Sequence, residues 1–392
     1  MNIRHALLLA VPACLAISAC GGDSKSTPAQ TPAAQTPAAQ TPAAQTPAAA
    51  APSNPAPAAK PNVSPAPAGN EVAGQDPKPA PKKPTPPVRL DMVLVKTFFG
   101  SEPMAPAVDN PSTPEKVALG KALYHEQHLS KNGNLSCASC HNLSTYGVDN
   151  KPTSPGSDGK NGDRNTPTTY NAFRNYAQFW DARATTVEEQ SIMPVLNPVE
   201  HGIADEAQLV AKIKEKAELV DGFKKAFPGA ADPVTADNFK LAIGAFERTL
   251  ITKSKFDKFV EGDQKALSNE EKLGLKTFMD TGCTQCHMTR LLGGNMIQKL
   301  GVYKPYATED TGRMKVTGSD ADKFMFKVPS LLNIAKTAPY YHDGKIATLE
   351  EAVHNMAEIQ LGKTLTKEQT DAIVAFLNTL TGELPAEFAQ AK

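Results

Sequence analysis

The chain contains two copies of the pattern Cys-x-x-Cys-His, one at Cys137–His141 and one at Cys283–His287. Cysteine pairs at this spacing can bind zinc, and in an exported protein they can form disulfides. A histidine directly after each pair is instead the pattern of c-type haem attachment, in which two thiols form thioethers and the imidazole binds iron. We therefore expect two covalent haem c groups, held by Cys137, Cys140, His141, Cys283, Cys286 and His287.

The two remaining cysteines, Cys14 and Cys20, lie in an N-terminal segment that has the features of an export signal. A basic start precedes an apolar run that is too short to span a membrane. Ile17–Cys20 resembles a bacterial lipobox, so we expect a signal peptide at 1–19 and lipidation of Cys20. An ordinary signal peptide cleaved nearby is the alternative. Gly21 favours the outer membrane, with the protein in the periplasm and a lipid as its only membrane attachment.

Residues 20–87 predict a disordered linker rather than a folded domain. The repeat TPAAQ begins at Thr31, and Pro, Ala and Lys dominate the sequence up to Pro87. Such a segment has too few large apolar residues to offset the entropy lost on ordering. The 41 basic and 41 acidic residues of the whole chain cancel, which gives no indication of a nucleic-acid partner.

Beyond residue 88 the sequence predicts an all-α, mostly helical fold. Helices are expected to start at Ser112-Thr113-Pro114-Glu115, Ser268-x-x-Glu271 and Thr366-x-x-Gln369, and one more is expected from Thr235 to about Leu250. A helix before the haem motif and another at the end of the domain is the order found in c-type cytochromes. We therefore expect two cytochrome domains, at 88–255 and 256–392.

Longer stretches around the motifs resemble one protein family. They read LGKALYHEQHLSKNGNLSCASCHN, RNTPTTYNA, AQFWDARATTVEEQ, NPVE and TAPYYHDGKIATLEEAV, and the resemblance spans about residues 88–383. Their order and spacing are similar to those of the bacterial dihaem cytochrome c peroxidases, which include the MauG-type enzymes. The resemblance implies two haems with different tasks, a low-potential peroxidatic haem at His141 and a high-potential, electron-accepting haem at His287.

The resemblance also implies how electrons reach the first haem. Trp180 matches the tryptophan that lies between the two haems as an electron bridge; the alternative is a buried aromatic residue without a redox role. Met356 matches the sixth ligand of the second iron, where MauG-type enzymes carry a tyrosine. A thioether favours Fe(II) and so raises the potential. The alternatives are that Met356 only packs, with Met314 or Met325 as the ligand.

Glu200 matches the acid/base group that moves a peroxide proton, and Gln190 matches its companion amide. Without the resemblance, Glu200 would be interpreted as an acidic residue at a helix start and Gln190 as a solvent-exposed side chain. Asn165, Thr337 and Pro339 match positions that bind a calcium ion through one amide and backbone carbonyls, which are oxygen ligands that Ca²⁺ accepts.

The sequence departs from the family pattern in the loop after the first motif. Many members carry a histidine there that blocks the peroxidatic iron until the second haem is reduced; this chain has Ser157 at that position. No histidine occurs between His141 and His201. His201, next to Glu200, can be a polar neighbour, a second acid/base group or a substitute blocking ligand.

These observations predict a peroxidase that takes electrons from a small c-type cytochrome or cupredoxin and reduces hydrogen peroxide without prior reductive activation. A MauG-like oxidase of a protein substrate is an alternative, against which Met356 counts. A non-enzymatic electron carrier is another, against which Glu200, Gln190 and the absent blocking histidine count. A homodimer is among the oligomeric states compatible with the sequence.

Overall fold

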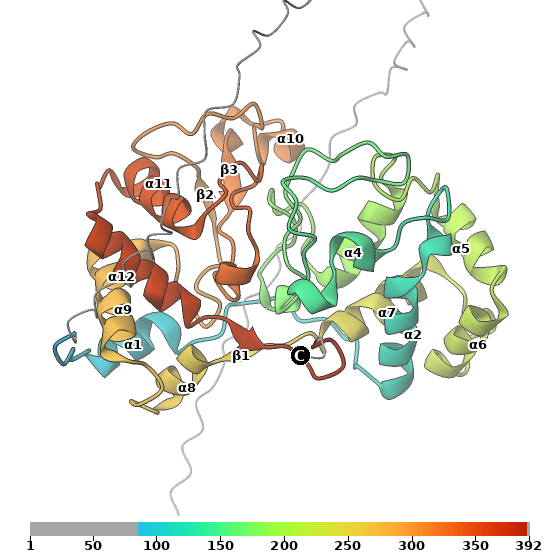
Figure 1. Cartoon of the computed structure of the whole chain (residues 1–392). Helices are drawn as coiled ribbons and strands as arrows, with labels where there is room; N and C mark the ends of the chain where they lie inside the picture. Colours follow the sequence, from blue (N-terminus) through green and yellow to red (C-terminus); the bar gives the residue numbers. More distant parts are fainter. Residues whose placement is uncertain (1–84, 390–392) are drawn as a thin grey trace, which may run out of the picture. The chain divides into compact units, whose positions relative to one another are not determined.

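The computed structural model of the chain describes residues 85–389 (Figure 1). The expected signal peptide, Cys20 and all but the last three residues of the expected linker lie outside this range. Within residues 85–389, no helix has the length and the apolar character needed to cross a membrane.

The described part of the chain is mostly helical, as the sequence predicts. Its α-helices are α1 (Met92–Phe99), α2 (Pro114–His125), α3 (Cys137–Cys140), α4 (Val187–Leu196), α5 (Glu206–Lys214), α6 (Ala217–Ala226), α7 (Ala236–Glu247), α8 (Lys255–Glu261), α9 (Asn269–Thr281), α10 (Met314–Thr317), α11 (Leu349–Leu361) and α12 (Lys367–Asn378). Sheet is limited to two short antiparallel pairs: β1 (Lys253–Ser254) with β4 (Gly382–Glu383), and β2 (Ile297–Lys299) with β3 (Met325–Lys327).

Side-chain hydroxyls cap the helices that the sequence predicts. Thr113, Thr235, Ser268 and Thr366 each accept a hydrogen bond from a backbone N–H in the first turn, which otherwise has no partner inside the helix. At Ser268 and Thr366 the cap is reciprocal, because the side chains of residues 271 and 369 bond back to the cap backbone. The predicted starts of α2, α7, α9 and α12 are therefore confirmed.

Two helix pairs cross in the same way, α2 against α7 and α9 against α12 (Figure 1). A glycine lies at each crossing. A Cβ atom on Gly120 would come within 2.0 Å of the Ala242 carbonyl oxygen, and one on Gly274 within 1.9 Å of the Ala372 carbonyl oxygen. Only glycine allows the backbones to approach so closely, and the chain uses this arrangement once before each haem motif.

Buried apolar side chains form two clusters. The first includes residues of α2 and α4–α7, and its last buried member in sequence is Leu250. The second includes residues of α8, α9, α11 and α12, from Phe256 onward, together with two residues of α1. Each cluster also receives residues from the far end of the described chain. Val95 and Phe99 of α1 are buried in the second cluster, and Phe388 packs against the first.

Candidate functional site

The first haem motif forms the short helix α3 and places its histidine directly after it. Ser136 caps this helix, and Cys137 packs against the first apolar cluster. The His141 Nδ1 donates to the Gly147 carbonyl oxygen at 3.2 Å. Burial lowers the pKa of His141, which keeps the imidazole neutral. A neutral ring that donates from Nδ1 leaves the Nε2 lone pair free for a metal.

The second motif repeats this local design. Cys283 opens a 3₁₀ turn, Cys283–Gln285, and packs against the second apolar cluster. The His287 Nδ1 donates to the Leu292 carbonyl oxygen at 2.8 Å, and burial lowers the pKa of His287 as well. Both histidines therefore present Nε2 as the free nitrogen, held by a backbone carbonyl in the manner of metal-bound histidines.

Burial has the largest effect on the thiols of the two motifs. Burial raises the pKa of Cys137 and of Cys283 to about 12. The four motif cysteines are free thiols, and within residues 85–389 no three His, Cys, Asp or Glu side chains gather into a metal-binding group. The arrangement fits thioether attachment of haem at each motif.

A largely apolar cavity lies beside the second motif. Its lining includes Cys283, Cys286, His287 and Met356, with apolar residues such as Phe278, Leu300, Val328, Leu331 and Val353. Of the three methionines that the sequence offers as ligands, Met356 on α11 lines this cavity. The cavity thus joins one imidazole and one thioether, which is a ligand pair found in haem proteins that transfer electrons.

Two polar side chains that line the same cavity lack an ionic or hydrogen-bond partner that a haem carboxylate could supply. Lys327 on β3 is 8% exposed, and burial lowers its pKa to about 8. No ion pair joins it to another described residue. A buried, unpaired charge is costly. The buried Nδ1 of His342 also lacks a hydrogen-bond partner. The residues present therefore fit an anionic porphyrin in this cavity.

Trp180, which lies between the two motifs in sequence, also lines the cavity. Its Nε1 donates to the Asn165 carbonyl oxygen at 2.9 Å, and its own carbonyl oxygen accepts from the Lys327 backbone N–H at 2.7 Å. Its ring lies edge-on to His342, with ring centres 6.4 Å apart. Trp180 is thus fixed between segments from both halves of the described chain.

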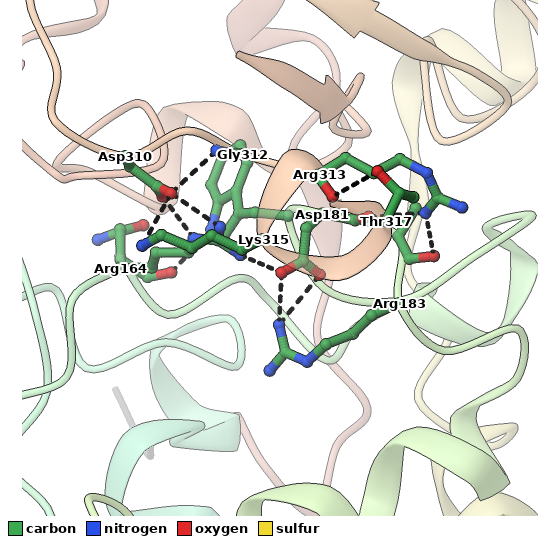
Figure 2. Close-up of polar contacts among 11 residues, drawn as sticks. Arg164, Asp181, Arg183, Asp310, Gly312, Arg313, Lys315 and Thr317 are labelled. Atoms are coloured by element: carbon green, nitrogen blue, oxygen red, sulfur yellow. Dashed lines mark hydrogen bonds and ion pairs between the residues drawn. The ribbon is translucent and has the colours of Figure 1, made fainter. Parts of the chain in front are cut away.

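A network of ion pairs holds the Trp180 segment (Figure 2). Arg164 donates to Asp310 from Nε at 2.6 Å and from a terminal nitrogen at 3.0 Å, and it donates to Asp181 at 2.6 Å. Burial alone would raise the pKa of Asp310, but hydrogen bonds from Arg164 and Gly312 keep it below its usual range. Arg183 donates to both carboxylate oxygens of Asp181. Sequence analysis missed this network, although RNTPTTYNA and AQFWDARATTVEEQ contain three of its residues.

Glu200 follows α4 and lies near the first motif. Burial raises the pKa of Glu200, partly offset by a 2.7 Å hydrogen bond from Asn197 Nδ2 and by the charge of Arg183. Burial, and to a smaller extent the charge of Glu200, raises the pKa of the Cys137 and Cys140 thiols. Gln190 is half-buried on α4, the helix that leads to Glu200.

Ser157 is held by hydrogen bonds close to Glu200. Its backbone N–H donates to the Glu200 carbonyl oxygen at 2.8 Å. Its hydroxyl donates to Asn134 Oδ1 at 2.8 Å and accepts from the Asn132 N–H at 3.1 Å. The hydroxyl of Ser157 is therefore already engaged by the segment that precedes the first motif.

His201 is buried beside the same site. Its Nδ1 donates to the Leu129 carbonyl oxygen at 3.0 Å, and burial lowers its pKa. Burial also lowers the pKa of His141, and the nearby His201 adds to this effect. The ring of His201 is therefore a neutral group near the first motif, with Nε2 as its remaining nitrogen.

The three residues matched to a calcium site line one cavity. Asn165, Thr337 and Pro339 all belong to the lining described above. The Asn165 Nδ2 donates to the Lys151 carbonyl oxygen at 2.9 Å, which orients the amide and leaves Oδ1 as its acceptor end. Asn150 Nδ2 donates to the Ala338 carbonyl oxygen at 2.9 Å and so ties this segment to the loop after the first motif.

Comparison with known proteins agrees with this arrangement. The family described as "Di-haem cytochrome c peroxidase" matches residues 114–265. The cytochrome c551 peroxidase of Nitrosomonas europaea is 46% identical over 293 residues, which cover 73% of this chain and 86% of that protein. The methylamine utilization protein MauG of Methylorubrum extorquens is 33% identical over 309 residues, covering 75% of this chain and 86% of that protein.

A solved structure shows the same fold. The crystal structure of a MauG-like protein associated with microbial copper homeostasis superposes with a TM-score of 0.65 at 29% identity, covering 74% of this chain and 95% of that one. The two haem motifs, the ordered matches along most of the described chain and this shared fold lead to one conclusion. The chain belongs to the family of dihaem cytochrome c peroxidases, which includes the MauG proteins.

Proposed function

We propose that this protein is a cytochrome c peroxidase that reduces hydrogen peroxide to water with electrons from a small c-type cytochrome or cupredoxin. One observation carries the proposal: the two haem motifs have different surroundings. The second shares a cavity with Met356, whereas the first lies near the buried carboxyl of Glu200. Relatives named cytochrome c551 peroxidase, at 46% and 45% identity, support the same activity.

At the first motif, a bound haem supplies the iron at which peroxide receives two electrons. Glu200 takes the proton of the inner peroxide oxygen and returns it to the outer oxygen, which then leaves as water. Burial raises the pKa of Glu200, which makes its carboxylate a better proton acceptor than an exposed glutamate. Asn197 orients its carboxyl group. Gln190 on α4, the family's companion amide, is proposed to position the peroxide. One peroxide, two electrons and two protons give two waters.

At the second motif, His287 and Met356 line one cavity and would both ligate a bound haem, so this site would pass electrons and leave no position for peroxide. A thioether ligand keeps the potential high enough to receive electrons from a soluble donor. Trp180 carries them onward, because it lines this cavity and its indole N–H bonds Asn165, in the segment after the first motif.

We infer the following organisation for the whole chain. Two c-type cytochrome domains, 88–255 and 256–392, correspond to the two apolar clusters, with α1 packed on the second. A disordered linker (20–87) follows a signal peptide (1–19), and lipidated Cys20 anchors the protein to the outer membrane from the periplasm. Asn165, Thr337 and Pro339 bind Ca²⁺, whose ligands come from both domains.

The peroxidatic site is ready without reductive activation. The position of the blocking histidine is occupied by Ser157, and hydrogen bonds to Asn134, Asn132 and Glu200 already engage this residue. A serine hydroxyl is also a poor ligand for ferric haem. His201 is a polar neighbour of the site in this proposal; its Nδ1 donates to the Leu129 carbonyl oxygen.

A MauG-like oxidase of a protein substrate is the second candidate, favoured by the relationship to MauG at 33% identity. Met356 in the cavity of the second motif speaks for the peroxidase, since the family resemblance places a tyrosine there in the MauG-type enzymes. Glu200 and the unblocked first site speak against a simple electron carrier.

An electron count on the holoprotein tests the proposed function. Protein with both haems reduced should lose both electrons to one equivalent of hydrogen peroxide, and a reduced small cytochrome c should then be oxidised at two electrons per peroxide. Stopped-flow absorption of the haems, together with an independent peroxide assay, measures both quantities. A protein that exchanges electrons with the donor but leaves peroxide intact would be a carrier.

A further inference from the structure

A row of aromatic side chains leads away from Trp180. The ring centres of Trp180 and His342 lie 6.4 Å apart, and those of His342 and Tyr306 lie 5.9 Å apart, both edge-on. Phe326 lies against His342 at 4.4 Å. The row thus gives a path of touching π systems from the tryptophan between the two motifs to a half-buried tyrosine.

Tyr306 differs from other tyrosines of the chain in its hydrogen-bond acceptor. Its hydroxyl donates to the two carboxylate oxygens of Asp343, at 3.0 and 3.2 Å. Five other tyrosines donate to backbone carbonyl oxygens: Tyr124, Tyr146, Tyr170, Tyr340 and Tyr341. A carboxylate is a base within proton-transfer distance, whereas a carbonyl oxygen cannot keep a proton.

This difference decides which tyrosine can be oxidised. Removal of an electron makes a phenol hydroxyl strongly acidic, so the oxidation becomes favourable when a base takes the proton in the same step. Asp343 is such a base, and Lys345 lies 3.1 Å from its second oxygen. In the resting protein, burial and the negative charge of Asp343 raise the pKa of Tyr306, so the hydroxyl carries its proton.

We propose that Tyr306 is a redox-active residue that gives one electron, through His342 and Trp180, to the haem pair oxidised by peroxide while its proton passes to Asp343. The O–H bond of Tyr306 breaks, an O–H bond forms on the Asp343 carboxyl, and Tyr306 becomes a neutral tyrosyl radical. Peroxide is the oxidant. The inference rests on the proposed peroxidase function and adds to it an outlet for oxidising equivalents when the donor is scarce.

Freeze-quench electron paramagnetic resonance on the holoprotein tests this role. The oxidised protein is mixed with excess hydrogen peroxide and no donor, with ring-deuterated tyrosine incorporated in a parallel sample. We expect a radical signal that narrows on deuteration and is lost in Tyr306→Phe. The matched control Tyr341→Phe removes a hydroxyl from the ring 5.2 Å away, and it should keep the signal because Tyr341 bonds a carbonyl.

A second variant tests the proton step. Asp343→Asn keeps the size of the side chain but removes the base, so radical formation should be slower while Tyr306 is still present. A radical signal of unchanged yield in Tyr306→Phe, or one that forms at an unchanged rate in Asp343→Asn, would overturn the proposal. Peroxide consumption in the same samples reports on the peroxidase itself: consumption without a tyrosyl radical overturns only the role of Tyr306, and no consumption overturns both.

Discussion

Replacement of Glu200 by glutamine should lower peroxide turnover by roughly 10²–10⁴-fold, the usual contribution of a positioned proton-transfer group. Glutamine can accept the hydrogen bond from Asn197 but cannot take a proton from peroxide. Both haem spectra should stay unchanged, because Glu200 belongs to neither motif. Steady-state kinetics with reduced donor measures the loss. Glu189→Gln, an exposed glutamate on α4, is the matched control and should keep full activity.

The pH profile separates proton transfer from a structural role of Glu200. Burial raises the pKa of this carboxyl, so its base form is lost at a higher pH than in an exposed glutamate as the solution is acidified. The wild-type kcat/KM should fall on the acid side through this raised pKa, and Glu200→Gln should lack that limb. If the variant keeps wild-type turnover and the same profile, Glu200 is only structural.

Replacement of Met356 by histidine should lower the potential of the second haem on the order of 0.2 V, within the roughly 0.8 V that axial ligands span. Imidazole favours Fe(III) more than a thioether does. About 59 mV corresponds to a tenfold change in the equilibrium constant of a one-electron transfer. The equilibrium constant for electron transfer from the donor would therefore fall by roughly three orders of magnitude. Spectroelectrochemistry measures the shift, with loss of the methionine-to-iron absorption band.

Met314→His is the control for this experiment, because Met314 begins α10 and the lining of the cavity contains Met356 instead. The potential of the second haem should not move in that variant. An unchanged potential and absorption band in Met356→His would instead show that Met356 only packs on α11.

Local patterns in the sequence predict much of the fold because capping and haem attachment depend on neighbouring residues. The starts of α2, α7, α9 and α12 follow from one hydroxyl residue and the apolar spacing behind it. The two motifs also predict His141 and His287 as the histidines that bind haem. The close crossings at Gly120 and Gly274 are less visible, because a glycine inside a helix does not reveal its partner.

Contacts between distant segments could not be predicted in this way. Arg164 and Asp310 pair across 146 positions, and no local pattern selects these two charges from the many in the chain. No local pattern predicts, either, that the Tyr306 hydroxyl donates to the Asp343 carboxylate. At Ser157 the sequence shows that the blocking histidine is absent, but only the structure shows its hydroxyl bonded to Asn134.

We expect the first site to be open and the second to be a relay, and the fully oxidised holoprotein distinguishes this arrangement from a blocked first site. Stopped-flow mixing with hydrogen peroxide, with spin-resonance spectra of the same sample before mixing, is the measurement. We expect a high-spin first haem that reacts at once, without prior one-electron reduction, in wild type and in His201→Ala. A low-spin, bis-histidine first haem that reacts only after reduction, and whose signal disappears in His201→Ala, would contradict it.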